Sequence, residues 1–288
     1  MMRLDYRVTE RDHLRRAGRL AAEKFSLSQH DLNYLKKTNG LLADGHPIRQ
    51  IDRVRMGMLL SVILPDESTE THASPIGLIY EDKVLRIIDK PAGLATMASC
   101  RAGGQSLEAE YTAAYGAFRP VSRLDKGTGG LMVCAKTGYY QHRLSAQLHS
   151  DRLIREYLAV AEGCILPDAG LIDLPISHVE DSANLRQTGP DGKPAQTFYR
   201  VIRRENSRTL LRLRLITGRT HQIRVHLAAI GHPICGDYLY GSPLPAFDGC
   251  FALHSAYLFL THPLTGEHLF FRSKPPEKFD DLLRSSNQ

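Results

Sequence analysis

The spacing of the apolar runs in residues 76–288 limits the possible folds more than any other feature of this sequence. Six short, mostly apolar runs are typical of strands, at 84–88, 131–135, 157–161, 197–201, 210–215 and 257–260. Helical character is confined to 106–115, 141–149 and 221–230. Because helices do not alternate regularly with the runs, a doubly wound parallel sheet is disfavoured. We expect an α+β domain with a large, mixed but mostly antiparallel sheet and flanking helices.

Residues 1–65 carry most of the net charge. They hold twelve Lys or Arg against seven Asp or Glu, which leaves +5 of a total of +6. A basic segment of this kind favours a polyanionic partner over an acidic one.

The same segment has the pattern of a small α/β module. Ser28 can cap a helix that Gly40 ends, Asp44-Gly45 predicts a hairpin turn, and 58–64 predicts a strand. A basic helix followed by a β-ribbon resembles the S4 RNA-binding module, which would occupy residues 1–65. The alternative is a small structural cap on the main domain.

Residues 66–75 are polar and lack apolar periodicity. Their composition predicts a linker between residues 1–65 and a second domain, residues 76–288. We find no internal repeat and no low-complexity segment in the chain.

The cysteines and the N-terminus indicate a reducing compartment. The five cysteines are at least fifteen residues apart and form no CxxC pair, so they are expected to be free thiols. The first residues lack the apolar core of a signal peptide, and the longest apolar run, 56–64, is too short to cross a bilayer. We expect a cytoplasmic protein without a membrane partner, and a monomer.

Asp125 is the first candidate for catalysis, because it precedes an apolar strand in a glycine-rich turn. A carboxylate nucleophile must stay ionised, which a nearby cation favours. In a strand Arg123 would share the face of Asp125 and Lys126 would point away. The alternative is an ordinary surface Asp, since Asp-Lys-Gly is common in turns.

Residues 215–241 are dense in Arg, His and Gly. We expect a strand, a tight turn at Gly218 and a helix capped by Thr220, which places Arg219 at a corner where a guanidinium can reach a carboxylate. His221 and His226 are five residues apart and do not share a helix face, unlike the i, i+4 pair of zinc hydrolases. No metal is expected.

Five segments, in order along the chain, resemble the motifs of the RluA family of pseudouridine synthases, which act on ribosomal large-subunit and transfer RNA. They are residues 89–94, 123–131, 155–160, 217–224, and 253–255 with 262–263. The resemblance covers about residues 78–275. Two positions depart from the family pattern: Ser122 replaces a His, and Gly129 replaces a Ser.

The resemblance implies the pseudouridine synthase fold with a central cleft, and conversion of uridine in rRNA or tRNA to pseudouridine without cofactor or metal. By position, Asp125 is the catalytic carboxylate, which attacks the sugar or the base or removes a sugar proton. Arg219 is its ion-pair partner. Tyr157 stacks on the uracil near C5, where its phenol is the base. Arg123 fills the space that the flipped uracil leaves.

Two other functions remain open. A non-catalytic RNA-binding or ribosome-assembly protein would use the S4-like module with an inactive synthase domain, which the presence of Asp125, Tyr157 and Arg219 disfavours. A hydrolase with Asp125 as a covalent nucleophile would need a separate base to activate water, and the basic N-terminal segment would have no role in it.

Overall fold

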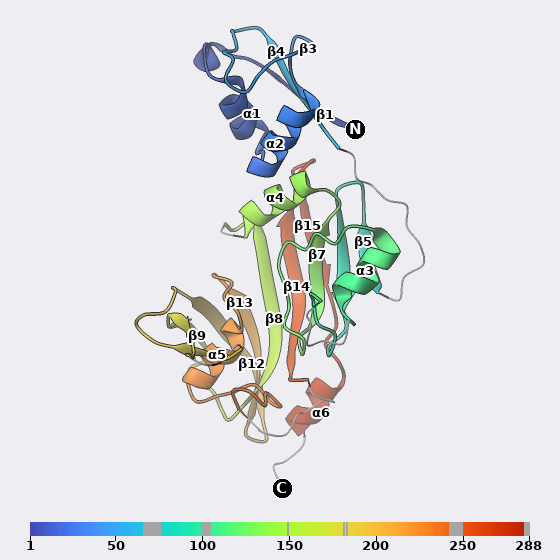
Figure 1. The fold of residues 1–288 in the computed structure, drawn as a ribbon. Helices are drawn as coiled ribbons and strands as arrows, with labels where there is room; N and C mark the ends of the chain where they lie inside the picture. Colours follow the sequence, from blue (N-terminus) through green and yellow to red (C-terminus); the bar gives the residue numbers. More distant parts are fainter. Residues whose placement is uncertain are drawn as a thin grey trace.

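The computed structural model describes residues 1–65, 76–98, 105–148, 150–180, 182, 184–241 and 250–284. A small N-terminal module lies at one end of a larger α+β part (Figure 1). The linker predicted at 66–75 and the last residue of the helix predicted at 141–149 lie outside the described residues. No helix among the described residues is long and apolar enough to cross a membrane.

The N-terminal module, residues 1–65, has a four-stranded sheet in the order β1-β4-β2-β3, with two helices. Its elements are β1 (Met2–Arg7), a 3-10 turn (Glu10–Asp12), α1 (Ala17–Phe25), α2 (Gln29–Thr38), β2 (Leu41–Ala43), β3 (His46–Pro47) and β4 (Leu59–Leu64). Strand β1 and helix α1 are additions to the sequence prediction. Strand β1 is rich in charged residues and pairs antiparallel with β4 along its whole length.

Local signals in this module act as the sequence predicts, with one correction. Ser28 caps α2 in a reciprocal capping box with Asp31. The helix ends at Asn39, which takes the left-handed conformation (φ 52°), so Gly40 is not the terminating residue. Asp44 and Gly45 both have positive φ, as the two-residue hairpin between β2 and β3 requires.

The larger part is built on a nine-stranded sheet in the order β5-β6-β7-β14-β8-β13-β12-β9, with β15 also paired to β14. The strands are β5 (Gly77–Glu81), β6 (Leu85–Lys90), β7 (Gly129–Ala135), β8 (Leu153–Glu162), β9 (Ala169–Asp173), β12 (Gln196–Glu205), β13 (Arg208–Leu215), β14 (Leu253–Thr261) and β15 (His268–Arg272). Among the described strands, only β7 with β14 is a parallel pair. The predicted α+β class with a mostly antiparallel sheet is confirmed.

A two-stranded ribbon and four helices complete this part. They are β10 (Ile176–His178) with β11 (Arg186–Thr188), and α3 (Leu107–Tyr115), α4 (Gly138–Gln147), α5 (Gln222–Ala229) and α6 (Lys278–Arg284). The three predicted helices correspond to α3, α4 and α5. The short α6, the ribbon and strands β5, β9 and β15 were not predicted.

The start of β7 fixes the central strands against each other. Gly130 pairs with Ser255 on β14 and has a φ of +107°, and a Cβ there would lie 2.3 Å from the Ser255 carbonyl oxygen. Only glycine permits this close parallel pairing. Ser255 in turn pairs with Tyr157 on β8. The residues before β7 therefore lie near Tyr157, with β14 between the two strands.

The N-terminal module packs against helix α4 (Figure 1). Tyr139, Tyr140 and Leu144 of α4 belong to the same buried cluster as Leu20 and Leu60 of the module. The Tyr140 hydroxyl also lies 3.1 Å from the Met2 sulfur. One apolar core thus extends from the module into the larger part.

Candidate active site

Asp125 lies in a cleft with a volume of about 680 Å³. Arg123, Tyr157 and Arg219, the other three residues predicted from the sequence, also line it. The structure therefore brings all four predicted residues together from three separate segments of the chain. Arg155 adds a further guanidinium to the wall.

Asp125 lies in a loop, because β7 begins only at Gly129. The expectation that Arg123 and Asp125 share one face of a strand is wrong. Leu124 is buried between them, and its carbonyl accepts a hydrogen bond of 2.6 Å from the Thr96 hydroxyl. Anchoring Leu124 leaves both neighbours directed to the cleft.

Buried Lys90 stabilises the loop that carries Asp125 through hydrogen bonds to backbone carbonyls. Its ammonium group donates to the carbonyl oxygens of Pro91 (2.9 Å), Leu94 (2.7 Å) and Lys126 (3.3 Å). Burial lowers the pKa of Lys90 to about 8, so the group remains largely charged at neutral pH. The segment 89–94 therefore holds the loop that carries Asp125.

Asp125 pairs with Arg224. An oxygen of the carboxylate lies 3.3 Å from a terminal nitrogen of the guanidinium, and the Arg224 side chain is only 4% exposed. Among the described residues Arg219 makes no ion pair with Asp125, so that prediction is wrong. Arg219 precedes α5 on an exposed turn and donates to the Pro194 carbonyl at 3.0 Å.

The orientation of Arg224 is set by Asp237, whose carboxylate is fully buried. Two nitrogens of the guanidinium donate to the two carboxylate oxygens at 2.7 and 2.8 Å, and the group lies 4.2 Å from the centre of the Phe251 ring. The third nitrogen is left for Asp125. Neither Arg224 nor Asp237 was predicted from the sequence, although both lie in the segment 215–241. The signal that could have found them is Asp237, an acid in a basic segment to which no role was assigned.

Gln222 shapes the turn that precedes α5. Its side-chain oxygen accepts from the Thr217 hydroxyl and the Arg219 amide, and its nitrogen donates to the Gln196 carbonyl. The helix N-cap is His221, with φ 58° and no side-chain cap. The prediction that Thr220 caps the helix is therefore wrong, because Gln222 ties the turn to β12 instead.

His221 also faces Asp125. One ring nitrogen lies 2.8 Å from the Tyr240 hydroxyl and the other 3.9 Å from the carboxylate. Burial lowers the pKa of His221, against the opposing effect of Asp125, so the ring is neutral at pH 7 and Arg224 is the permanent cation beside Asp125. Among the described residues no group of three or more His, Cys, Asp or Glu is placed to hold a metal ion.

Tyr157 forms part of the cleft wall and is only 5% exposed. Burial raises the pKa of Tyr157, against the opposing effect of the Arg155 charge, and the charge of Asp125 adds to the increase. The phenol therefore keeps its proton at neutral pH. A role as proton acceptor requires another group to take that proton.

Known proteins are similar to this chain over most of its length. Residues 84–229 match the family model described as RNA pseudouridylate synthase. The ribosomal large subunit pseudouridine synthase D of Nitrosomonas europaea is 40% identical over 238 residues, which cover 76% of this chain and 68% of the relative. The protein of the same name from Haemophilus influenzae is 37% identical over 256 residues, 81% of this chain and 79% of the relative. A solved structure, human RNA pseudouridylate synthase domain containing 4, has a TM-score of 0.57 and 26% identity and covers 73% of this chain and 95% of its own.

Proposed function

Because the chain belongs to the RNA pseudouridylate synthase family, we propose that it isomerises uridines of large-subunit ribosomal RNA, with Asp125 as the catalytic carboxylate. The names of the relatives support the ribosomal substrate. The observation that carries the role of Asp125 is its pairing, inside the cleft, with an arginine that a second buried acid holds in place. A hydrolase and a non-catalytic binding protein both fit this family assignment poorly.

Arg224 orients Asp125 through a charge-assisted hydrogen bond. The carboxylate remains 26% exposed toward the cleft, so it can reach a bound nucleotide. The reaction breaks the bond from the ribose to the uracil nitrogen, turns the uracil and forms a bond from the same ribose carbon to C5. Attack on the sugar, attack on the base and removal of a sugar proton all start from this carboxylate.

Tyr157 is proposed to pack against the uracil and to act at C5, where a proton finally leaves. Its phenol is protonated before the reaction, since burial raises its pKa. It therefore accepts the C5 proton only as it passes its own proton to a neighbouring base, and Asp125 is the carboxylate at hand in the cleft.

Arg123 and Arg219 are proposed to bind RNA at the rim of the cleft. Both are exposed, and neither has an ion-pair partner among the described residues. Arg123 is suited to fill the space of the flipped uracil, because a guanidinium stacks on bases. Arg219 does not pair with Asp125, and its guanidinium is suited to bind a backbone phosphate.

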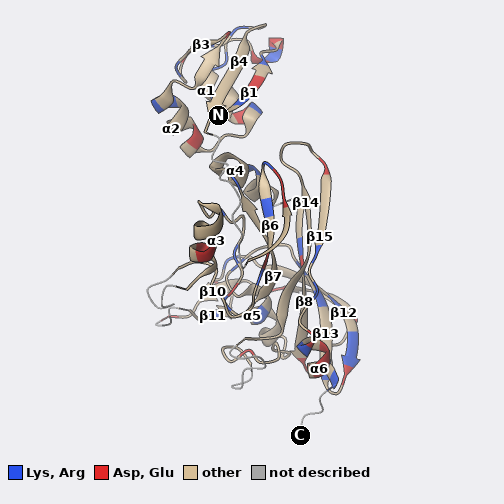
Figure 2. Cartoon of the chain, turned by 90° about the vertical axis from the view of Figure 1, so that its right-hand side faces the viewer, with Lys and Arg blue, Asp and Glu red and all other residues tan. Residues whose placement is uncertain are grey.

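The N-terminal module is proposed to be an S4-like RNA-binding domain, with residues 76–288 as the synthase domain. Four exposed cations on its helices and their flanks have no ion-pair partner in the described part of the chain: Arg16, Arg19, Lys36 and Lys37. Lys and Arg positions are visible on the module (Figure 2). Deleting the module would expose the apolar residues of α4, so substitution of these cations is the sounder test. We also propose a monomer, since described residues of one chain line the cleft, and a cytoplasmic location, since the relatives are named for action on the ribosomal large subunit.

Tritium release from C5-labelled uridine in transcripts of large-subunit rRNA tests the proposal. Wild-type protein should release tritium, and Asp125→Asn, which keeps the shape of the side chain, should not, while binding RNA with similar affinity. Release by Asp125→Asn at the wild-type rate would remove Asp125 from the mechanism. Mapping of pseudouridines in total RNA with and without the protein identifies the uridines, and modification of tRNA alone would overturn the ribosomal assignment.

A further inference from the structure

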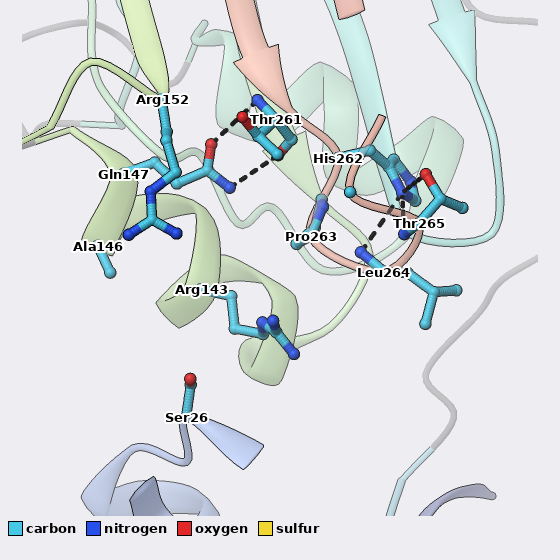
Figure 3. Close-up of a pocket in the computed structure, with 11 residues that line it drawn as sticks. Ser26, Arg143, Ala146, Gln147, Arg152, Thr261, His262, Pro263, Leu264 and Thr265 are labelled. Atoms are coloured by element: carbon cyan, nitrogen blue, oxygen red, sulfur yellow. Dashed lines mark hydrogen bonds between the residues drawn. The ribbon is translucent and has the colours of Figure 1, made fainter. Parts of the chain in front are cut away.

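A second pocket, with a volume of about 400 Å³, lies where the N-terminal module meets the synthase part. Figure 3 shows its residues. The module contributes Ser26, at the end of α1; helix α4 contributes Arg143 and Gln147; and Arg152 lies just before β8. The turn between β14 and β15, residues 261–266, closes the other side. We call this the junction pocket.

Most polar groups of the junction pocket are used within the protein. The Gln147 amide donates to the Thr261 carbonyl at 2.7 Å and accepts from the Thr261 amide at 3.2 Å, which ties α4 to the end of β14 (Figure 3). His262 accepts from the Thr265 amide at 3.0 Å, and its other ring nitrogen lies 3.0 Å from the Asp82 carboxylate. These bonds stabilise the walls of the pocket, and the side chains of Gln147 and His262 are therefore not available to bind a ligand.

The two arginines differ from the rest of the lining. The Arg152 side chain makes no hydrogen bond or ion pair among the described residues, and Arg143 donates only to the neutral phenol of Tyr139, at 2.8 Å. The carboxylate next in sequence, Asp151, is held by Arg214 at 2.7 Å. In Figure 3 both guanidinium groups extend from their elements toward the space that Ser26 borders.

None of the described residues that line the junction pocket is an Asp or a Glu. Two guanidinium groups in a polar recess without a counter-charge attract an anion, and the planar fork of arginine matches the oxygens of a phosphate. The ligand chemistry that fits is therefore a phosphate group.

The junction pocket and the active-site cleft are lined by residues that are neighbours in the sequence. Leu148 lines the cleft and follows Gln147, which lines the junction pocket. Arg152 precedes Tyr157 by five residues, and at the rise of a strand this separates their Cα atoms by at most about 17 Å. A polymer whose uridine enters the cleft can therefore reach the pocket.

We propose that the junction pocket binds a backbone phosphate of the same RNA whose uridine enters the cleft. The proposal rests on the proposed function. It assigns Arg143 and Arg152 to substrate binding away from the reacting base. The module and the synthase part then both lie beside one phosphate. That contact fixes the position of the RNA where it passes from the module to the synthase part.

Two RNAs that carry the mapped uridine provide the test: a short hairpin limited to the target loop, and a longer rRNA fragment with its flanking helices. With the long fragment, Arg143→Gln/Arg152→Gln should bind roughly tenfold more weakly, and the slope of log affinity against log salt should fall by about one to two. Binding of the hairpin and the turnover rate at saturating RNA should remain those of the wild type. The matched control is Arg203→Gln/Arg204→Gln, which removes the same charge from arginines already paired with Asp280 and Asp168.

Wild-type affinity and salt slope for the double variant on the long fragment would overturn the proposal, and so would equal weakening by the control. Arg152→Gln alone guards against misfolding, since its side chain makes no bond to lose, and it should show a smaller loss of the same kind. Normal binding of naked RNA with loss of modification in cells would assign the pocket to a protein partner instead. A wild-type protein that is inactive on every RNA contradicts the proposed function, whereas an active wild type with an indifferent variant contradicts only the junction pocket.

Discussion

The carboxylate of Asp125 and the guanidinium of Arg224 lie 3.3 Å apart although 99 residues separate them along the chain. The other two guanidinium nitrogens donate to the carboxylate of Asp237. Arg224 thus bridges two acids, one fully buried and one open to the cleft. Its removal acts on stability and on catalysis at once.

Arg224→Gln should lose at least about 100-fold in kcat and destabilise the protein by about 3 kcal/mol, because it leaves the buried Asp237 without its partner. Tritium release and urea denaturation measure the two effects. Arg219→Gln is the matched control: it should raise KM with little change in kcat, as expected for a residue that contacts only bound RNA. A loss of kcat in Arg219→Gln as large as that in Arg224→Gln would restore Arg219 as the partner of Asp125.

Tyr157→Phe should lose about 100-fold or more in kcat and retain its affinity for RNA, since the ring remains and only the proton-transferring hydroxyl is removed. Single-turnover tritium release with a parallel binding measurement separates the two. A Phe variant with the wild-type rate would reduce Tyr157 to a surface on which the uracil packs.

Gly130→Ala should destabilise the protein by about 3 kcal/mol or more, because the new Cβ would lie 2.3 Å from the Ser255 carbonyl oxygen at a positive φ. Gly129→Ser should cost less, since the nearest atoms to a Cβ there are 3.3 Å away. Gly138→Ala, at the first residue of α4 with nothing within 4 Å, is the control and should be neutral or stabilising. Thermal unfolding ranks the three, and a Gly130→Ala protein as stable as Gly138→Ala would contradict the close pairing of β7 with β14.

The free energy of unfolding should fall as the pH drops below about 6.5, the ordinary pKa of histidine. Burial lowers the pKa of His226 and of His254 in the folded protein, so the unfolded chain binds more protons in this window and stability rises with pH. Each group contributes a slope of at most about 1.4 kcal/mol per pH unit. Urea denaturation at pH 7.5 and pH 5.5 measures the loss.

His226→Gln should flatten this dependence, whereas His46→Gln, at an exposed position, should leave it unchanged. An unaltered slope in His226→Gln would show that His226 does not stay neutral in the fold.

Features that depend on a few neighbouring residues followed from the sequence. The helix cap at Ser28, the turn at Asp44-Gly45 and the apolar strand after Asp125 are all set by local chemistry, and the structure contains all three. Strand β1 was not predicted because charged residues alternate with its half-buried Met2, Leu4 and Tyr6, so that no continuous apolar run is visible in the sequence. Its stability comes from pairing with β4 and from contacts with α4, which lie far along the chain.

The choice between Arg219 and Arg224 was beyond local inference for the same reason. Both arginines lie in one short segment, and the choice depends on where α5 begins. His221 and Gln222 set that start through contacts with β12 and Tyr240, and Asp237, thirteen residues after Arg224, then selects the guanidinium it can hold. Arg123 and Asp125 reached the same cleft from a loop rather than a strand, since Leu124 is anchored by Thr96.

The apolar core shared by the N-terminal module and α4 fixes the distance between the module and the active-site cleft. With Tyr140 in contact with Met2 and with Leu20 and Leu144 in one cluster, the distance from the module to Asp125 cannot change without separating buried side chains. An RNA-binding module at a constant distance from the catalytic residue measures a fixed distance along a folded RNA. Under the proposed function, a uridine is then selected by its distance from a second structural feature of the RNA, and the bases around it can vary.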